Sequence, residues 1–125
     1  MATIPVTAVN LDGISSLAKS YLWTSLIAGS LVGARANVAE AGVSLTFQAI
    51  GATFASATLT LRGSNKPDPD VTVAADWFTL KQTDGTDATL TEAGGLSVSD
   101  LPLWVCPIIA GGGGTEDVTV RLVVR

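Results

Sequence analysis

The side chains whose spacing comes closest to a metal site are Asp68 and Asp70, with Asn65 nearby. Hard oxygen ligands at alternating positions of a tight loop are typical of calcium sites. Calcium loops usually supply more carboxylates and a glycine at the sharp bend, whereas Pro67 and Pro69 interrupt this segment. The segment is therefore interpreted as a solvated turn, and a calcium site is the weaker alternative.

A run of four glycines, residues 111–114, raises the question of a phosphate-binding loop. Such a loop needs a following helix whose N-terminal amides point at the anion, and usually a lysine. Here Glu116 and Asp117 bring negative charge, and the pattern that follows is that of a strand. The glycines are expected to form a flexible hairpin connection, and no cofactor is predicted.

Catalytic chemistry finds little support in the residue types. The chain has eleven Asp and Glu residues, but most fall in turn sequences. Solvation in turns keeps carboxylate pKa values near their usual range, whereas catalytic carboxylates usually have perturbed ones. There is no histidine to activate a serine or threonine, and Cys106 is the single cysteine. No basic residue neighbours Cys106 in the sequence, so a small buried side chain is expected there and not a reactive thiol. The chain is predicted not to be an enzyme, and no metal ligands are assigned.

The aromatic residues Trp23, Trp77 and Trp104, with Tyr21, allow two interpretations. They could form a platform on which sugars stack, or they could fill the core and anchor a subunit interface. The second interpretation is preferred. Trp23 and Trp104 are accordingly candidate interface residues.

Charge and composition exclude several partners. Seven Lys and Arg against eleven Asp and Glu give a net charge of -4, which disfavours nucleic acid. Only 14% of the residues are charged while 47% are hydrophobic, so the surface must be largely uncharged and suits dense assembly. The N-terminal residues lack the basic and apolar segments of a signal peptide, so the protein is expected to be made in the cytoplasm.

Residues 43–63 carry no charge before Arg62, which raises the possibility of a membrane span. Apolar and polar residues alternate instead: Leu45 and Phe47 fall on one parity, and Leu59 and Leu61 are separated by Thr60. A period of two predicts half-buried strands and no membrane contact. The segment is expected to form an antiparallel strand pair with Gly51 between its two runs.

The remaining strands are expected at 21–27, 77–80, 88–91, 103–109 and 118–124. Residues 34–41 are expected to be irregular or a short strand, Gly94 and Gly95 to close the strand at 88–91, residues 96–101 to form a helical turn, and Pro107 to lie at an edge or bulge. Short strands separated by frequent turns predict one all-β, antiparallel β-sandwich over residues 21–125. Residues 1–20 lack a clean period and are expected to form an extended N-terminal arm.

The order of these pieces resembles small decoration, or cement, proteins of tailed bacteriophage heads. The resemblance spans about residues 23–125 and rests on Gly42, Gly51-Ala-Thr-Phe54, Ala57-Thr-Leu-Thr-Leu-Arg-Gly-Ser-Asn65, Asp76-Trp-Phe-Thr-Leu80, Thr83-Asp-Gly85, Trp104-Val-Cys-Pro107 and Val118-Thr-Val-Arg-Leu122. The chain departs from it at Lys66-Pro67, where relatives tend to have Asp-Gly, and at Cys106, where they tend to have a basic residue.

The resemblance implies a jelly-roll-like sandwich without catalysis that binds the outer surface of a capsid shell, often as a homotrimer. The partner would be the major capsid protein, and the protein would be found in the virion. The arm is expected to reach neighbouring subunits, because the sandwich has no obvious need for its apolar residues Ile4, Val6, Val9 and Leu11. A carbohydrate-binding or adhesive module of a fibre or tail, and a head–tail joining component, are the alternatives.

Overall fold

The computed structural model describes residues 2–4, 6–10, 19–26, 31–33, 35–38, 45–111 and 117–124. Two antiparallel sheets pack face to face, and the only helical element in these ranges is a 3-10 turn, η1 (Ala74–Asp76). The predicted all-β sandwich is confirmed. The jelly-roll pattern of its connections stays a prediction.

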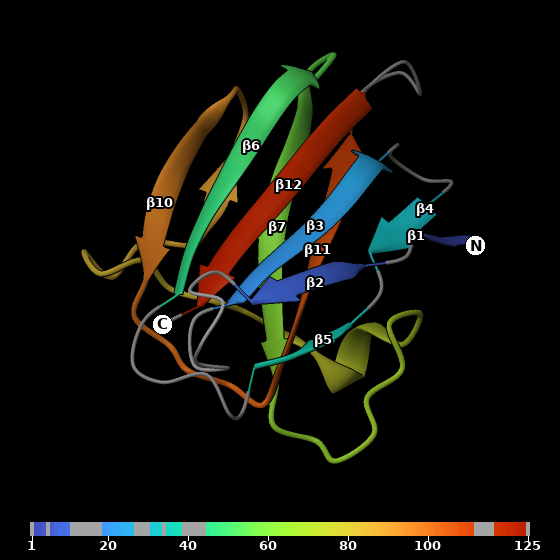
Figure 1. Ribbon diagram of the computed structural model, residues 1–125, viewed down its shortest axis with the longest axis vertical. Helices are drawn as coiled ribbons and strands as arrows, with labels where there is room; N and C mark the ends of the chain where they lie inside the picture. The colour runs from blue at the N-terminus through green and yellow to red at the C-terminus, as the bar shows by residue number, and fades with distance from the viewer. Residues whose placement is uncertain are drawn as a thin grey trace.

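The first sheet has the strand order β10-β6-β12-β3-β2, and every neighbouring pair is antiparallel. Figure 1 shows β6, β12 and β3 crossing in front of the second sheet. Its strands are β2 (Thr7–Asn10), β3 (Lys19–Leu26), β6 (Leu45–Thr53), β10 (Gly94–Val98) and β12 (Asp117–Val124).

The second sheet has the order β5-β11-β7-β8, and β9 pairs with a further part of β7. Its strands are β5 (Ala36–Asn37), β7 (Ala57–Ser64), β8 (Phe78–Thr79), β9 (Thr89–Leu90) and β11 (Trp104–Gly111). Beside the two sheets, β1 (Ala2–Ile4) and β4 (Leu31–Gly33) form a short parallel pair.

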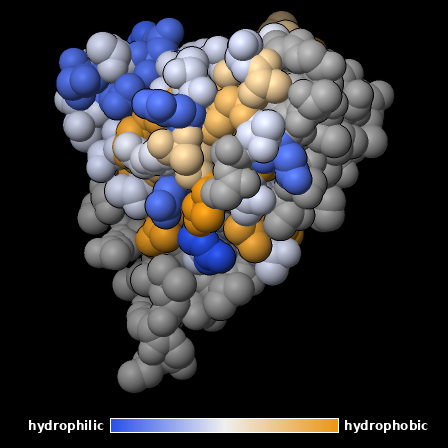
Figure 2. All heavy atoms as spheres, turned by 90° about the horizontal axis from the view of Figure 1, so that it is seen from above, coloured by the Kyte–Doolittle hydropathy of each residue, from blue (hydrophilic) through white to orange (hydrophobic). Residues whose placement is uncertain are grey.

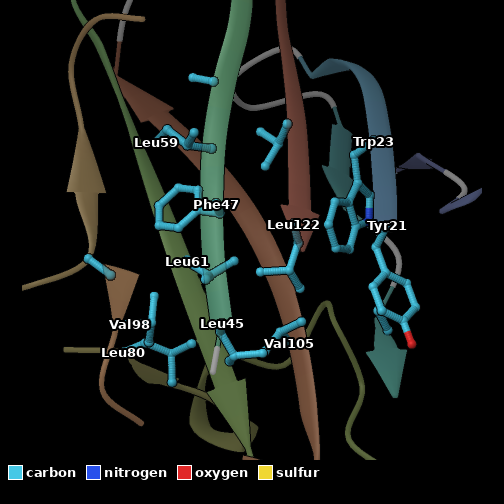
Figure 3. Packing of buried hydrophobic residues seen from close by; sticks show 14 of the residues in the cluster. Tyr21, Trp23, Leu45, Phe47, Leu59, Leu61, Leu80, Val98, Val105 and Leu122 are labelled. Carbon is cyan, nitrogen blue, oxygen red and sulfur yellow. The ribbon is translucent and has the colours of Figure 1, made fainter. Parts of the chain in front are cut away.

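The core lies between the sheets and follows the predicted period of two. On β6, Leu45 and Phe47 are buried while Thr46 and Gln48 are exposed, and on β7 Leu59 and Leu61 are fully buried. Side chains from both sheets interdigitate, as Figure 3 shows for Phe47, Leu61 and Leu122. Removal of this apolar surface from water is the main stabilising contribution to the sandwich.

The expected pairing of the two strands in residues 43–63 is wrong. Strand β6 pairs with β10 and β12, whereas β7 pairs with β11, so the two strands face each other from different sheets. The connection also lies later than Gly51, which is inside β6. It is a turn in which Ala55 and Ser56 have φ of 48° and 66° and the Ala57 N–H donates to the Phe54 carbonyl at 2.7 Å.

Two further expectations about connections are wrong. Gly94 and Gly95 do not close a strand, and residues 96–98 are not helical, because Gly94–Val98 is β10 and Leu96 pairs with Phe47 of β6. Cross-strand packing therefore outweighs the low strand propensity of glycine. Strands β11 and β12 are in different sheets, so the glycine run between them does not connect a hairpin. Residues 112–116 themselves lie outside the described ranges.

Other local predictions are confirmed or refined. Residues 36–37 form the short strand considered for 34–41, and residues 83–86 form the expected turn, where the Asp84 carboxylate accepts the Thr86 N–H at 2.9 Å. Pro107 pairs with β7 but lies beyond the two residues of β11 that pair with β5, which fits an edge position.

The strand at 77–80 is shorter than expected, and its burial does not alternate. Trp77 and Leu80 are both buried, while Phe78 between them is 43% exposed. A strand of only two residues does not keep a fixed parity, because the chain leaves the sheet on either side of it.

Part of the predicted N-terminal arm belongs to the first sheet. Residues Thr7 and Asn10 of β2 pair with Leu22 and Lys19 of β3 at the edge of the sheet. Residues 11–18 lie outside the described ranges. The projection of residues 1–20 towards neighbouring subunits stays a prediction.

In the portion of the chain that the structure describes, no helix has the length and apolar character needed to cross a bilayer.

Candidate functional site

The predicted interface residues of the N-terminal segment lie in different places. Ile4 is in β1, and Val9 of β2 pairs with Ser20 of β3. Val6 is partly buried and packs against the core. Leu11 lies outside the described ranges. Val6, whose side chain is described, therefore contributes at least partly to the sandwich itself.

The three tryptophans do not share a surface. Trp23 is fully buried between the sheets, as the core interpretation predicts. Trp77 is 9% exposed and Trp104 is half-buried, and each has an arginine over its ring. A sugar platform that includes Trp23 is excluded by this burial, whereas Trp104 remains a candidate interface residue.

Arg35 links Trp104 to the loop formed by residues 65–76, which we call the covering loop. The Arg35 guanidinium carbon lies 4.4 Å from the centre of the Trp104 ring. The same guanidinium donates to the Pro69 carbonyl at 2.7 Å and pairs with Asp68 at 2.7 Å. One side chain therefore combines a cation–π contact with two polar contacts to the loop. Asp68, a candidate calcium ligand, is used in an ion pair.

A second arginine lies beneath the covering loop. Arg62 on β7 is 9% exposed, its guanidinium carbon lies 5.3 Å from the Trp77 ring centre, and it donates to the Val71 carbonyl at 3.3 Å. Its Nη2 also contacts the Cys106 sulfur at 3.0 Å, while its Nε has no hydrogen-bond partner. Outward-facing residues of β7 and β11 are thus buried because the covering loop packs over them.

Cys106 has a basic neighbour in space that its sequence neighbours do not reveal. Burial nevertheless raises the pKa of the Cys106 thiol to about 11, because loss of hydration outweighs the attraction of Arg62 for the thiolate. The prediction of a small buried side chain is confirmed, and Arg62 is a basic neighbour that becomes apparent only in the folded chain.

We expect Cys106 to react with iodoacetamide at pH 8 at least about a hundredfold more slowly in the native protein than in urea, because its thiolate fraction is smaller and its sulfur is covered. The raised pKa also makes stability depend on pH, because the thiol ionises near pH 9 in the unfolded chain and only near pH 11 in the folded one. Its contribution to the free energy of unfolding is therefore fully present below pH 9 and is lost as the pH rises towards 11. Mass spectrometry measures the first effect, and urea titrations of wild type and Cys106→Ala between pH 8 and 11 measure the second. Equal alkylation rates in the two states would contradict the prediction.

The acidic residues of the covering loop are held by hydrogen bonds within it. The Asp70 carboxylate accepts from the Thr72 hydroxyl and N–H, and Asp76 accepts from the Asp70 N–H and from Lys66. These bonds hold the pKa values of Asp70 and Asp76 below their usual value of 3.8. Their contribution to loop stability is therefore present above pH 3.8 and is lost as the pH falls below it.

No metal site is found in the described part of the chain, where no three acidic or cysteine side chains gather as ligands would. Asp70 and Asp76 lie close together, but the second of them is already paired with Lys66 at 2.9 Å. The loop geometry is explained by these internal bonds.

Three large apolar side chains are exposed on segments that adjoin residues 63–65, and we call them the apolar rim: Phe78, Leu101 and Leu103. They are 43%, 53% and 40% exposed. Phe78 pairs with Gly63, and the Leu103 N–H donates to the Asn65 side chain at 3.1 Å. Exposed apolar side chains of this size are candidates for a protein contact surface.

The opposite end of the molecule, where β6 turns into β7, has a different character. Figure 2 shows apolar and polar residues interleaved on this end, with grey atoms over much of the rest. Phe54 in the turn is buried.

A shallow hollow of about 350 Å³ lies on the outer face of the first sheet. The strands β6, β10 and β12 contribute Gln48, Gly95 and Arg121, which are aligned across the sheet because Gln48 pairs with both of the others. Its full lining is Thr46, Phe47, Gln48, Gly95, Leu96, Ser97, Arg121 and Val123. No local sequence pattern indicates this site, because its three strands are far apart in the chain.

Comparison of the chain with known protein families, with curated protein sequences and with solved structures finds no match.

Proposed function

We propose that this chain is a non-catalytic structural protein of a tailed-bacteriophage virion. It binds the outer surface of the capsid as a homotrimer and stabilises contacts between major capsid protein subunits. The proposal includes three further points: a jelly-roll topology, synthesis in the host cytoplasm, and contacts from residues 1–20 to neighbouring subunits. It begins from the sequence resemblance described above.

The apolar rim is the observation that best supports this proposal. Phe78, Leu101 and Leu103 expose apolar surface near one end of the second sheet, where the described chain provides nothing to cover it fully. Burying apolar surface contributes about 25 cal/mol per Å², so a few hundred Å² at each contact gives several kcal/mol. Because the same contact is repeated at every symmetry-related position of the capsid, many modest contacts together give a large free-energy barrier to opening of the shell.

The second supporting feature is the uncharged outer face of β6 and β10. Exposed Thr46, Gln48 and Ser97 carry hydrogen-bonding groups without the charge that keeps crowded proteins apart. Such a surface can lie against a neighbour without leaving an unpaired charge buried.

The test is the location and occupancy of the chain in particles of the phage that encodes it. We expect cryo-electron microscopy to show it on the outer shell surface, and Phe78→Asp combined with Leu101→Asp to lower its occupancy at least tenfold. The loss follows from placing carboxylates in an apolar contact. Quantitative mass spectrometry of purified particles measures the occupancy.

Ala110→Asp is the control, because Ala110 is an exposed apolar residue of β11 that pairs with Thr58, at the far end of the second sheet from the apolar rim and away from the outer face of β6. It should leave occupancy within twofold of wild type, and circular dichroism should show all variants folded. A ring of copies at the portal would instead indicate the head–tail joining component. Density in fibres, with glycan binding, would indicate the adhesive module.

A further inference from the structure

Arg121 lines the hollow on the outer face of the first sheet and has no carboxylate partner among the described residues. It is the only charged residue in the described lining of the hollow. Its Nη1 donates to the Ser20 hydroxyl at 2.7 Å, and no described carboxylate lies within ion-pair distance of it. Ser20 belongs to β3, which lies on the other side of β12 from β6 and β10, so this contact holds one end of the guanidinium at the border of the hollow. The other guanidinium donors have no protein acceptors among the described residues.

The remaining lining groups suit a ligand that is both polar and partly apolar. Thr46 and Ser97 pair across β6 and β10 and supply hydroxyl groups, and Gln48 supplies an amide. Val123 on β12 adds an apolar wall beside Thr46. Gly95 has no side chain, so the space beside Gln48 is not filled. A Cβ added at Gly95 would occupy that space, 3.8 Å from the Gln48 Cβ and 3.3 Å from the Phe47 carbonyl oxygen.

We propose that this hollow binds a glutamate or aspartate side chain from an extended segment of a partner protein, with Arg121 as the residue that pairs with the carboxylate. A single guanidinium matches one carboxylate in charge and in planar geometry. In a chain of net charge -4, an otherwise uncharged surface around one arginine gives local complementarity to an acidic group. The volume is sufficient for a side chain and adjoining backbone, and is at the lower end for ligand pockets.

An acidic sugar fits this hollow less well than a peptide. Sugar sites commonly provide an exposed aromatic face, and the aromatic residue in this lining, Phe47, is 2% exposed and directed into the core. The assignment of the segment to the major capsid protein rests on the proposed function, whereas carboxylate binding does not.

The test uses the whole chain and two short peptides with blocked termini, one with a central glutamate and one with a central glutamine. At low ionic strength, we expect the glutamate peptide to shift the amide NMR signals of residues 46–48, 95–97 and 121–123 saturably. The glutamine peptide should bind at least tenfold more weakly, and Arg121→Gln should lower affinity for the glutamate peptide at least tenfold.

Lys66→Gln is the matched control, because it removes the same unit of charge from the covering loop and should leave the affinity unchanged. Thr46→Glu places a carboxylate within the hollow and should also abolish binding while the spectrum stays that of a folded protein. Equal binding of the two peptides, unchanged affinity in Arg121→Gln, or binding of galacturonate without binding of the peptide would overturn the proposal.

The peptide titration needs no phage particle, and the apolar rim lies outside the lining of the hollow. Carboxylate binding with no chain on the capsid would therefore contradict the proposed function alone. Normal capsid occupancy without peptide binding would contradict only the proposal that the hollow binds a carboxylate.

Discussion

Trp23→Ala is expected to lower the free energy of unfolding by about 3–5 kcal/mol, the range for removing a large buried aromatic side chain. Trp23 has no exposed surface, and its strand pairs with β12 through Val120 in the core of the sandwich. Truncation removes apolar contacts and leaves a cavity that surrounding side chains fill only in part. Urea denaturation followed by far-UV circular dichroism measures the change.

Ile50→Ala is the appropriate control for this experiment, since Ile50 is 38% exposed on β6. Its loss should be under about 1 kcal/mol. A Trp23 side chain that served mainly a subunit interface would give a small loss in the monomer, together with a denaturation midpoint that depends on protein concentration. That outcome would contradict the core position of Trp23.

Gly63→Val is expected to destabilise the protein by about 3 kcal/mol or more through overpacking. A Cβ at Gly63 would lie 2.5 Å from the Leu80 Cδ2 and 2.7 Å from the Pro102 Cγ. Leu80 is fully buried and Pro102 has a rigid ring, so neither atom can easily move away. Gly63→Ala should show a smaller loss in the same direction, measured by the same urea titration.

Gly94→Ala is the matched glycine control. The nearest atom to an added Cβ at Gly94 is the Leu90 Cδ2 at 3.9 Å, which is an ordinary contact. Its effect should stay within about 0.5 kcal/mol. Similar losses for Gly63→Ala and Gly94→Ala would show that the close approach of Leu80 and Pro102 does not limit position 63.

The parity of residues 45–61 made the strands predictable but not their pairing. A hairpin with Ala55 and Ser56 in its turn places residues of opposite parity across from one another, so Phe47 and Leu61 would lie on opposite faces of one sheet. Both are buried only if the two strands belong to facing sheets. This deduction needs the position of the turn, and the chain marks it with Ala-Ser, which is not a strong turn signal.

The strand position of Gly94 and Gly95 and the Arg62–Cys106 contact could not be predicted from the sequence for a different reason. Gly94 and Gly95 have low strand propensity, so local sequence predicts that a strand ends there. They belong to a sheet only because they pair with the neighbouring strand β6. Arg62 and Cys106 are 44 residues apart and meet because β7 and β11 pair in register. Local pattern carries no information about such long-range registers.

The candidate sites were less predictable than the fold. The sequence places Arg121 in the strand expected at 118–124, but its position in a hollow depends on β10 and β6 lying beside β12 in that order. The exposure of Phe78 depends on where a two-residue strand ends. Trp104 could be identified as an interface candidate, but its contact with Arg35 depends on the covering loop.

The central place of β12 has a consequence for how each molecule is made. Residues 117–124 insert between β6 and β3, whose sequences are translated much earlier. Until residue 124 leaves the ribosome, β6 and β3 lack the strand that joins them, and their apolar faces have no completed sheet to pack in. Folding of the first sheet must therefore wait until residues 117–124 have been synthesised, and a nascent chain that stalls before residue 117 exposes Phe47 and Trp23 to chaperones or to aggregation.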